Sequence, residues 1–154
     1  MKVCRGFTLL ELMVTVAVLA ILATVGIPSF VDLVQNNRVT TQANELVTAL
    51  NVARTEAVKR GRSVQVAVVQ EAPGWRATVS VVGDAGPAIR VVDRAGSVVT
   101  VNAATVVFQA TGQATVVPLG DFVMEPSTSC TGEKRRRIVV GPSGQVTTTR
   151  EACT

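Results

Sequence analysis

The chain has 154 residues and a formal net charge of +4; hydrophobic residues make up 47% of it and aromatic residues 3%. This length is enough for one domain of moderate size with a buried core. The sequence contains no histidine, so the commonest general base and metal ligand is missing, which argues against an enzyme. The basic bias is milder than that of a typical nucleic-acid-binding composition.

An apolar segment, residues 7–27, follows a short basic leader, residues 1–6. As a helix the segment would measure about 30 Å, which matches the hydrocarbon core of a bilayer. Its only charged residue is Glu11, and a carboxylate in lipid is costly unless it finds a partner. The segment is too long for an ordinary cleaved signal, and its small-residue cleavage site, Gly6, lies in front of it. We therefore expect the leader to be removed and the apolar helix to remain on the mature chain.

The residues RGFTLLEL at positions 5–12 resemble the processing motif of type IV pilins and type II secretion pseudopilins. The resemblance implies that a prepilin peptidase cleaves between Gly6 and Phe7 and methylates the new N-terminal Phe7. It also implies that Glu11 pairs with the terminal amine of a neighbouring subunit, since an amine and a carboxylate are each costly alone in lipid. A plain signal anchor held by its basic leader is the alternative.

Residues 28–61 predict the amphipathic second half of the same helix. Pro28 removes a backbone donor and is expected to kink the helix, although two helices with a loose joint at Pro28 are an alternative. Glu56 and Arg60 have the spacing of a helical ion pair, and Gly61 is expected to cap the C-terminus. The expected buried face recurs at steps of three and four and consists of Val39, Ala43, Leu46, Leu50, Ala53 and Ala57, widened by Val47 and Val58.

Residues 62–154 predict a β domain, because short Val-rich segments with alternating polarity are separated by Gly and Pro turns. Antiparallel strands of this length indicate two small sheets packed on the helix. With the leading helix, this α+β pattern resembles the pseudopilin subgroup called GspH, FimT or FimU. The expected strands are residues 63–68, 75–81, 89–92, 98–102, 106–109, 114–117, 122–125, 136–140 and 145–149.

Cys130 and Cys153 are an even pair in the expected β domain, whereas the third cysteine, Cys4, lies in the leader. The β domain is expected to face the periplasm or the exterior, where disulfides persist. A bond between the pair would close a loop of about 24 residues and stabilise the domain by roughly 3 kcal/mol. Two buried free thiols are the alternative. Two cysteines without histidine cannot complete a tetrahedral metal site, so no metal is expected.

The densest charge in the chain is a basic run near the C-terminus, with one more arginine across the expected terminal hairpin. If the strand begins at residue 136, the preceding cations lie on a loop and can fan out. Such a cluster can hold a DNA backbone, and FimT-type members of the resembled family are implicated in DNA capture, although their Gly-Arg-x-Arg motif is absent here. The alternative is a solvated charge run that protects a sheet edge. The cluster consists of Lys134, Arg135, Arg136, Arg137 and Arg150.

The resemblance implies a minor pilin or pseudopilin, anchored in the inner membrane by one pass, with its N-terminus cytoplasmic and its β domain periplasmic. Its partners would be other pilins or pseudopilins in a type IV pilus or a type II secretion pseudopilus. A DNA-capturing minor pilin for natural transformation is the alternative function. No nucleophile and base, phosphate loop or paired carboxylates can be identified, so we expect neither catalysis nor a cofactor.

Overall fold

The computed structural model describes residues 7–117, 121–128 and 130–153. The chain forms two compact units, Met1–Gln35 and Asn36–Thr154. One long helix, α1 (Leu9–Arg60), contributes residues to both units and contains Pro28 in its interior. The structure thus has the single helix that the sequence predicts, and not the alternative of two helices joined loosely at Pro28.

The C-terminus of α1 ends as the sequence predicts. Gly61 adopts a left-handed backbone with φ of 61°, and the next backbone N–H, that of Arg62, donates to the carbonyl of Ala57 at 3.3 Å. Arg60 Nε lies 2.6 Å from Glu56 Oε2, and this hydrogen bond lowers the pKa of the Glu56 carboxyl. The left-handed glycine allows a backbone hydrogen bond that caps the helix, and the ion pair stabilises its last turn.

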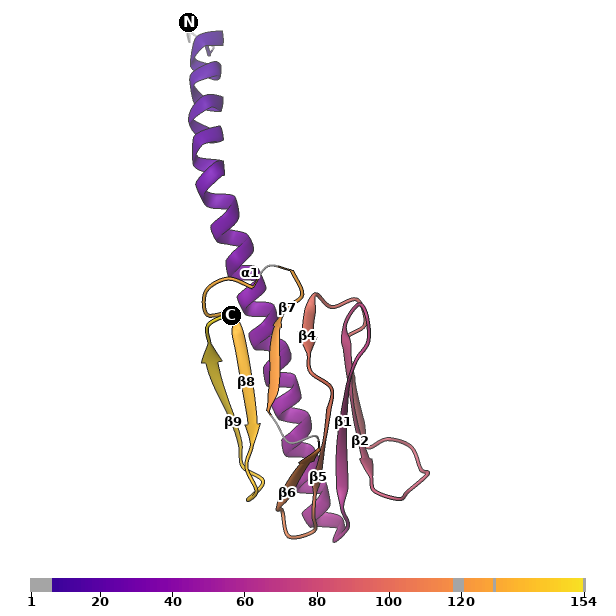
Figure 1. Cartoon of the computed structure of the whole chain (residues 1–154). Coiled ribbons are helices and arrows are strands. Elements are labelled where there is room, and N and C mark those ends of the chain that lie inside the picture. The colour runs from indigo at the N-terminus through magenta and orange to yellow at the C-terminus, as the bar shows by residue number, and fades with distance from the viewer. Residues whose placement is uncertain (1–6, 118–120, 129, 154) are drawn as a thin grey trace, which may run out of the picture. The chain divides into compact units, whose positions relative to one another are not determined.

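The second unit contains two antiparallel sheets that lie along the second half of α1 (Figure 1). The first sheet has the strand order β3-β2-β1-β5-β6 and the second has the order β4-β7-β8-β9. The predicted α+β class with two small sheets is thus confirmed. The strands are β1 (Val64–Gln70), β2 (Trp75–Val81), β3 (Arg90–Asp93), β4 (Val99–Val101), β5 (Ala104–Phe108), β6 (Ala114–Val117), β7 (Phe122–Pro126), β8 (Arg135–Val140) and β9 (Val146–Glu151).

The core forms where α1 meets the inward faces of both sheets, and every buried apolar residue among those described belongs to the second unit. All six positions of the predicted helix face are buried, and Ala49 joins them. Val58, expected to widen this face, is 54% exposed. The helical step of 100° per residue turns Val58 away from the face that its neighbour Ala57 occupies. Val47 packs against the core as expected.

Two hairpin turns meet α1 at one end of the domain. Arg54 donates from Nη2 to the carbonyl of Ser143 at 2.9 Å, and the backbone N–H of Ala114 donates to the carbonyl of Pro142 at 3.0 Å. Gly144 has φ of 76°, and a Cβ added there would overlap the carbonyl oxygen of Gly112. The turn after β8 therefore joins the two sheets and the helix, and it requires glycine at that position.

Candidate functional site

The apolar N-terminal segment begins with a helix cap. Thr8 precedes the first helical residue, Leu9, and its hydroxyl accepts a hydrogen bond from the backbone N–H of Glu11 at 3.2 Å. A threonine followed three residues later by a glutamate is the capping-box pattern, and a carboxylate in the first turn also interacts favourably with the helix dipole. The backbone amide of Glu11 thus has a local role besides the assembly role predicted for its carboxylate, and the Thr-x-x-Glu spacing signals it.

In the first unit, α1 exposes apolar side chains all around its circumference. By length and composition it can cross a membrane, a test that a signal sequence near an N-terminus also passes. The hydroxyls of Thr15 and Thr24 donate to carbonyls three residues earlier, at 2.8 and 2.7 Å, so neither remains an unsatisfied donor in an apolar surface. The exposed apolar residues include Phe7, Leu9, Leu10, Leu12, Met13, Val14, Val16, Val18, Leu19, Ile21, Leu22, Val25 and Ile27.

The processing site falls at the limit of the described residues. Gly6 lies outside them, and Phe7 is the first residue described, with 81% of its surface exposed. Glu11 is exposed and Pro28 lies within α1. Cleavage between Gly6 and Phe7, methylation of Phe7, the assembly role of Glu11 and a kink at Pro28 all stay predictions.

Residues 135–137 of the basic run lie on β8, which begins at Arg135 rather than at Arg136 as expected, and Lys134 directly precedes the strand. Successive side chains of a strand point to opposite faces, and the burial along β8 alternates accordingly: Arg136 and Ile138 are buried, whereas Arg135 and Arg137 are partly exposed. The cations of the strand therefore divide between the two faces of the second sheet and do not fan out from a loop.

Arg135 and Arg137 form a ladder of ion pairs across the outward face of the second sheet. Arg135 Nη2 lies 2.7 Å from Glu125 Oε2 on β7. Glu125 is opposite Arg135 in the antiparallel register, because Met124 pairs with Arg136. Arg137 contacts Glu151 on β9 at 2.5 Å and Asp121 at 3.0 Å. The hydrogen bond to Glu151, followed by that to Asp121, raises the pKa of the Arg137 guanidinium.

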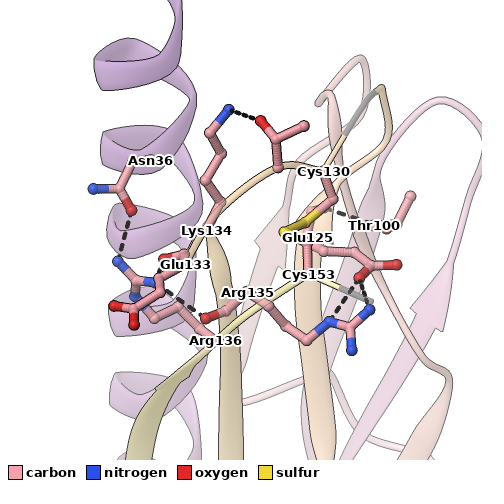
Figure 2. The surroundings of a disulfide bond; sticks show 10 residues. Asn36, Thr100, Glu125, Cys130, Glu133, Lys134, Arg135, Arg136 and Cys153 are labelled. Atoms are coloured by element: carbon pink, nitrogen blue, oxygen red, sulfur yellow. Dashed lines mark hydrogen bonds and ion pairs between the residues drawn. A yellow bond between two sulfur atoms is a disulfide. The ribbon is translucent and has the colours of Figure 1, made fainter.

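Arg136 points inward and reaches α1 (Figure 2). Its Nη2 donates to Asn36 Oδ1 at 2.7 Å and to Thr40 Oγ1 at 3.0 Å, while its Nη1 donates to the carbonyls of Glu133 and Arg135. The side chain is buried, with 4% of the residue exposed. Burial, followed by the nearby charge of Arg150, lowers the pKa of this guanidinium. None of the ion pairs found in the described part of the chain includes Arg136, so its four hydrogen-bond acceptors are neutral, while the nearby charge of the Glu133 carboxylate favours the charged guanidinium.

The remaining cations of the cluster, Lys134 and Arg150, differ in exposure. Lys134 is buried, and its Nζ donates to Thr131 Oγ1 at 3.2 Å, whereas Arg150 is exposed on β9. Since β8 lies between β7 and β9, it is not a sheet edge. The edge-protecting interpretation is therefore wrong for residues 135–137, which lie on an internal strand, whereas Arg150 lies on the edge strand β9. Most of its charge is buried or paired, an arrangement that does not favour a DNA-binding surface.

Cys130 and Cys153 form a disulfide with a Cα–Cα distance of 5.5 Å (Figure 2). The bond joins the loop before β8 to the segment after β9, and the backbone N–H of Cys153 donates to the carbonyl of Gly132 at 2.8 Å. The disulfide expected from the sequence is present, and it fixes the end of β9 beside the basic run. Among the described residues, no group of three or more His, Cys, Asp or Glu side chains is placed to hold a metal ion.

Two protein families match the chain. The family described as "Type II transport protein GspH" matches residues 42–144, and the "Prokaryotic N-terminal methylation motif" matches residues 1–27. Two fimbrial proteins of Pseudomonas aeruginosa are each 41% identical to the chain over 64 residues. That match covers 42% of this chain and 41% of each relative, so it spans less than half the length of these proteins.

Two crystal structures of the type IV minor pilin FimU from Pseudomonas aeruginosa have the same fold. They superpose with TM-scores of 0.53 and 0.55 at 22% sequence identity. The superpositions cover 71% and 72% of this chain and 91% and 87% of the FimU chains. At this identity the likeness establishes the fold.

A long helix packed on two antiparallel sheets, behind an N-terminal methylation motif, defines a subunit of the pilin and pseudopilin class. The GspH match spans residues 42–144 of 154, and the chain belongs to the GspH family. Proteins of this family are structural subunits rather than enzymes, in agreement with the expectation drawn from the composition.

Proposed function

We propose that the chain is a minor pilin or pseudopilin subunit that a prepilin peptidase cleaves between Gly6 and Phe7 and methylates on Phe7. The subunit then joins a type IV pilus or a type II secretion pseudopilus through its N-terminal helix. The observation that carries the proposal is the exposed apolar surface of α1 over residues 9–27, with one carboxylate, Glu11, in its first turn. An apolar surface of this extent requires a covering of lipid or of other helices.

Before assembly the inner membrane would cover this surface, with the N-terminus in the cytoplasm and the β domain in the periplasm. The basic leader supports this orientation, because positively charged residues stay on the cytoplasmic side of a first span. The disulfide between Cys130 and Cys153 supports it as well, since such bonds persist in the periplasm. In the filament the helices of other pilins or pseudopilins would replace the lipid.

Glu11 has two physical explanations, and a pair of substitutions separates them. Glutamine also serves in a capping box, so Glu11→Gln keeps the local hydrogen-bonding capacity and removes only the charge. If Glu11 pairs with the terminal amine of a neighbouring subunit, we expect Glu11→Gln and Glu11→Ala to reduce incorporation alike, by tenfold or more. The measurement is the amount of the subunit in sheared filaments relative to the amount in membranes.

Leu12→Ala is the matched control, because it changes the adjacent apolar residue and leaves the charge in place. Its incorporation should stay within about twofold of the unmodified chain, since one exposed side chain contributes little. Normal incorporation of Glu11→Gln beside a defect of Glu11→Ala would assign Glu11 to the helix cap and contradict its pairing with an amine.

A further inference from the structure

Arg136 makes an unusual set of contacts for a buried cation. An arginine is rarely this buried unless a carboxylate accompanies it, yet the four acceptors of Arg136 are two backbone carbonyls, an amide and a hydroxyl. Two of the acceptors, Asn36 and Thr40, lie four residues apart and therefore one above the other on the same face of α1. The planar guanidinium thus binds one complete turn of the helix from the facing strand.

The turn that Arg136 binds is the first turn of the second unit, since the division of the chain falls between Gln35 and Asn36. Val39, on the same turn, is the first residue of α1 that is completely buried, and Ala43 is the next. Apart from Val39, this turn has no buried apolar side chain. Arg136 therefore supplies a polar attachment at this turn, and Gln42 makes the next polar bonds along α1, to Trp75 and Ser97.

Thr40 strengthens this attachment within the helix. Its hydroxyl donates to the carbonyl of Asn36 at 2.8 Å while accepting from Arg136 at 3.0 Å. The hydroxyl is therefore oriented by the helix before it receives the guanidinium. Arg150 acts in the opposite sense, because its positive charge lies near that of Arg136 on the same face of the sheet.

We infer that Arg136 is a clamp that fixes the residue at which α1 leaves the β domain. With the clamp closed, the helix is held from Asn36 onward and the apolar part before it is available to a membrane or to other helices. Without the clamp, this turn keeps the packing of Val39 but loses the bonds at Asn36 and Thr40, and it can separate from the sheet as far as Gln42, which bonds Trp75 and Ser97. Arg136 is a positioning residue, and this role does not depend on N-terminal processing.

The test measures local separation by thiol alkylation of the full-length chain in detergent, with labelling assigned by peptide mass spectrometry. A cysteine at position 39 (Val39→Cys) reports on the clamped turn, and one at position 57 (Ala57→Cys) reports on the opposite end of the buried helix face. Arg136→Met should accelerate labelling at position 39 by about tenfold or more and leave position 57 within about threefold. Trp75 fluorescence checks that each variant is folded.

Two further variants keep the inference testable if Arg136→Met unfolds the domain. Asn36→Asp replaces the amide acceptor with a carboxylate of the same shape, which should strengthen the bond to Arg136 and slow labelling at position 39. Arg150→Met removes a neighbouring positive charge without removing these hydrogen bonds, and should not accelerate labelling at position 39. Equal acceleration at positions 39 and 57 in Arg136→Met, or an unchanged rate in both Arg136→Met and Asn36→Asp, would overturn the clamp.

Discussion

Single residues in this chain carry roles that differ from what their type suggests. Arg136 and Lys134 belong to a run of basic residues, a pattern that usually lies on the surface, yet both are buried. Glu11 is an acid in an apolar segment, and its backbone N–H takes part in the helix cap. For Arg136 and Lys134, hydrogen-bond acceptors within reach decide the position of the side chain, because a buried polar group without partners is costly.

Gly144 offers a test of the contact that joins the two sheets. Gly144→Ala should lower the free energy of unfolding by about 3 kcal/mol, because an alanine at positive φ costs roughly 1–2 kcal/mol and its Cβ would also overlap the carbonyl of Gly112. The measurement is urea unfolding followed by the fluorescence of Trp75, the single tryptophan, which is completely buried.

Gly96→Ala is the matched control for this substitution. Gly96 also has positive φ, 78°, but a Cβ added there would have no heavy atom within 4 Å. Only the backbone strain of about 1–2 kcal/mol should appear. Equal losses for the two variants would mean that the turn after β8 relaxes and that its close approach to Gly112 contributes no stability.

At the scale of the elements, the arginines of β8 connect this strand to its neighbours in the sheet and to the helix. Its alternate arginines connect β8 to β7 and β9 on the outward face and to α1 on the inward face. Partly exposed ion pairs each contribute little, typically below about 1 kcal/mol, so their main effect is on register and partner choice. The internal position of β8 explains why its cations are paired with acids from both neighbouring strands.

DNA binding by this element is the prediction that most needs a direct measurement. Since Arg135 and Arg137 are ion-paired and Arg136 is buried, we expect no salt-sensitive mobility shift of DNA at low salt, because binding depends on cations that can neutralise phosphates. The experiment compares the full-length chain in detergent with Arg62→Gln, a control at an exposed cation outside the cluster. A shift that is lost in Arg135→Ala/Arg137→Ala but kept in Arg62→Gln would support DNA capture instead.

Much of the element structure follows from local patterns in the sequence. The alternating Val-rich segments identify all nine strands in the described part of the chain, and the steps of three and four identify the buried face of α1. Sheet order could not be predicted in this way, since β1 lies between β2 and the later strand β5 through contacts distant in sequence. For the same reason, the acid partners of Arg135 and Arg137 and the burial of Arg136 were not foreseen.

At the scale of the whole molecule, the chain consists of an apolar helix that needs a covering and a β domain whose core is complete in itself. None of the apolar residues described before Asn36 is buried, and every buried apolar residue described lies after it. The two parts thus have different requirements, one for lipid or other subunits and one for internal packing. This division, together with the methylation motif at residues 1–27, is the physical basis of the proposed function.

The intact mass of the protein extracted from cell membranes tests this account most directly. Processing as proposed removes residues 1–6 and replaces one amine hydrogen of Phe7 with a methyl group. The mass should therefore equal that of residues 7–154 plus one CH2 unit, less two hydrogens for the disulfide. A Gly6→Leu variant is the control and should retain the leader. A mass that still includes Met1–Gly6 in the unmodified chain, or a mature chain without the added methyl, would contradict the account.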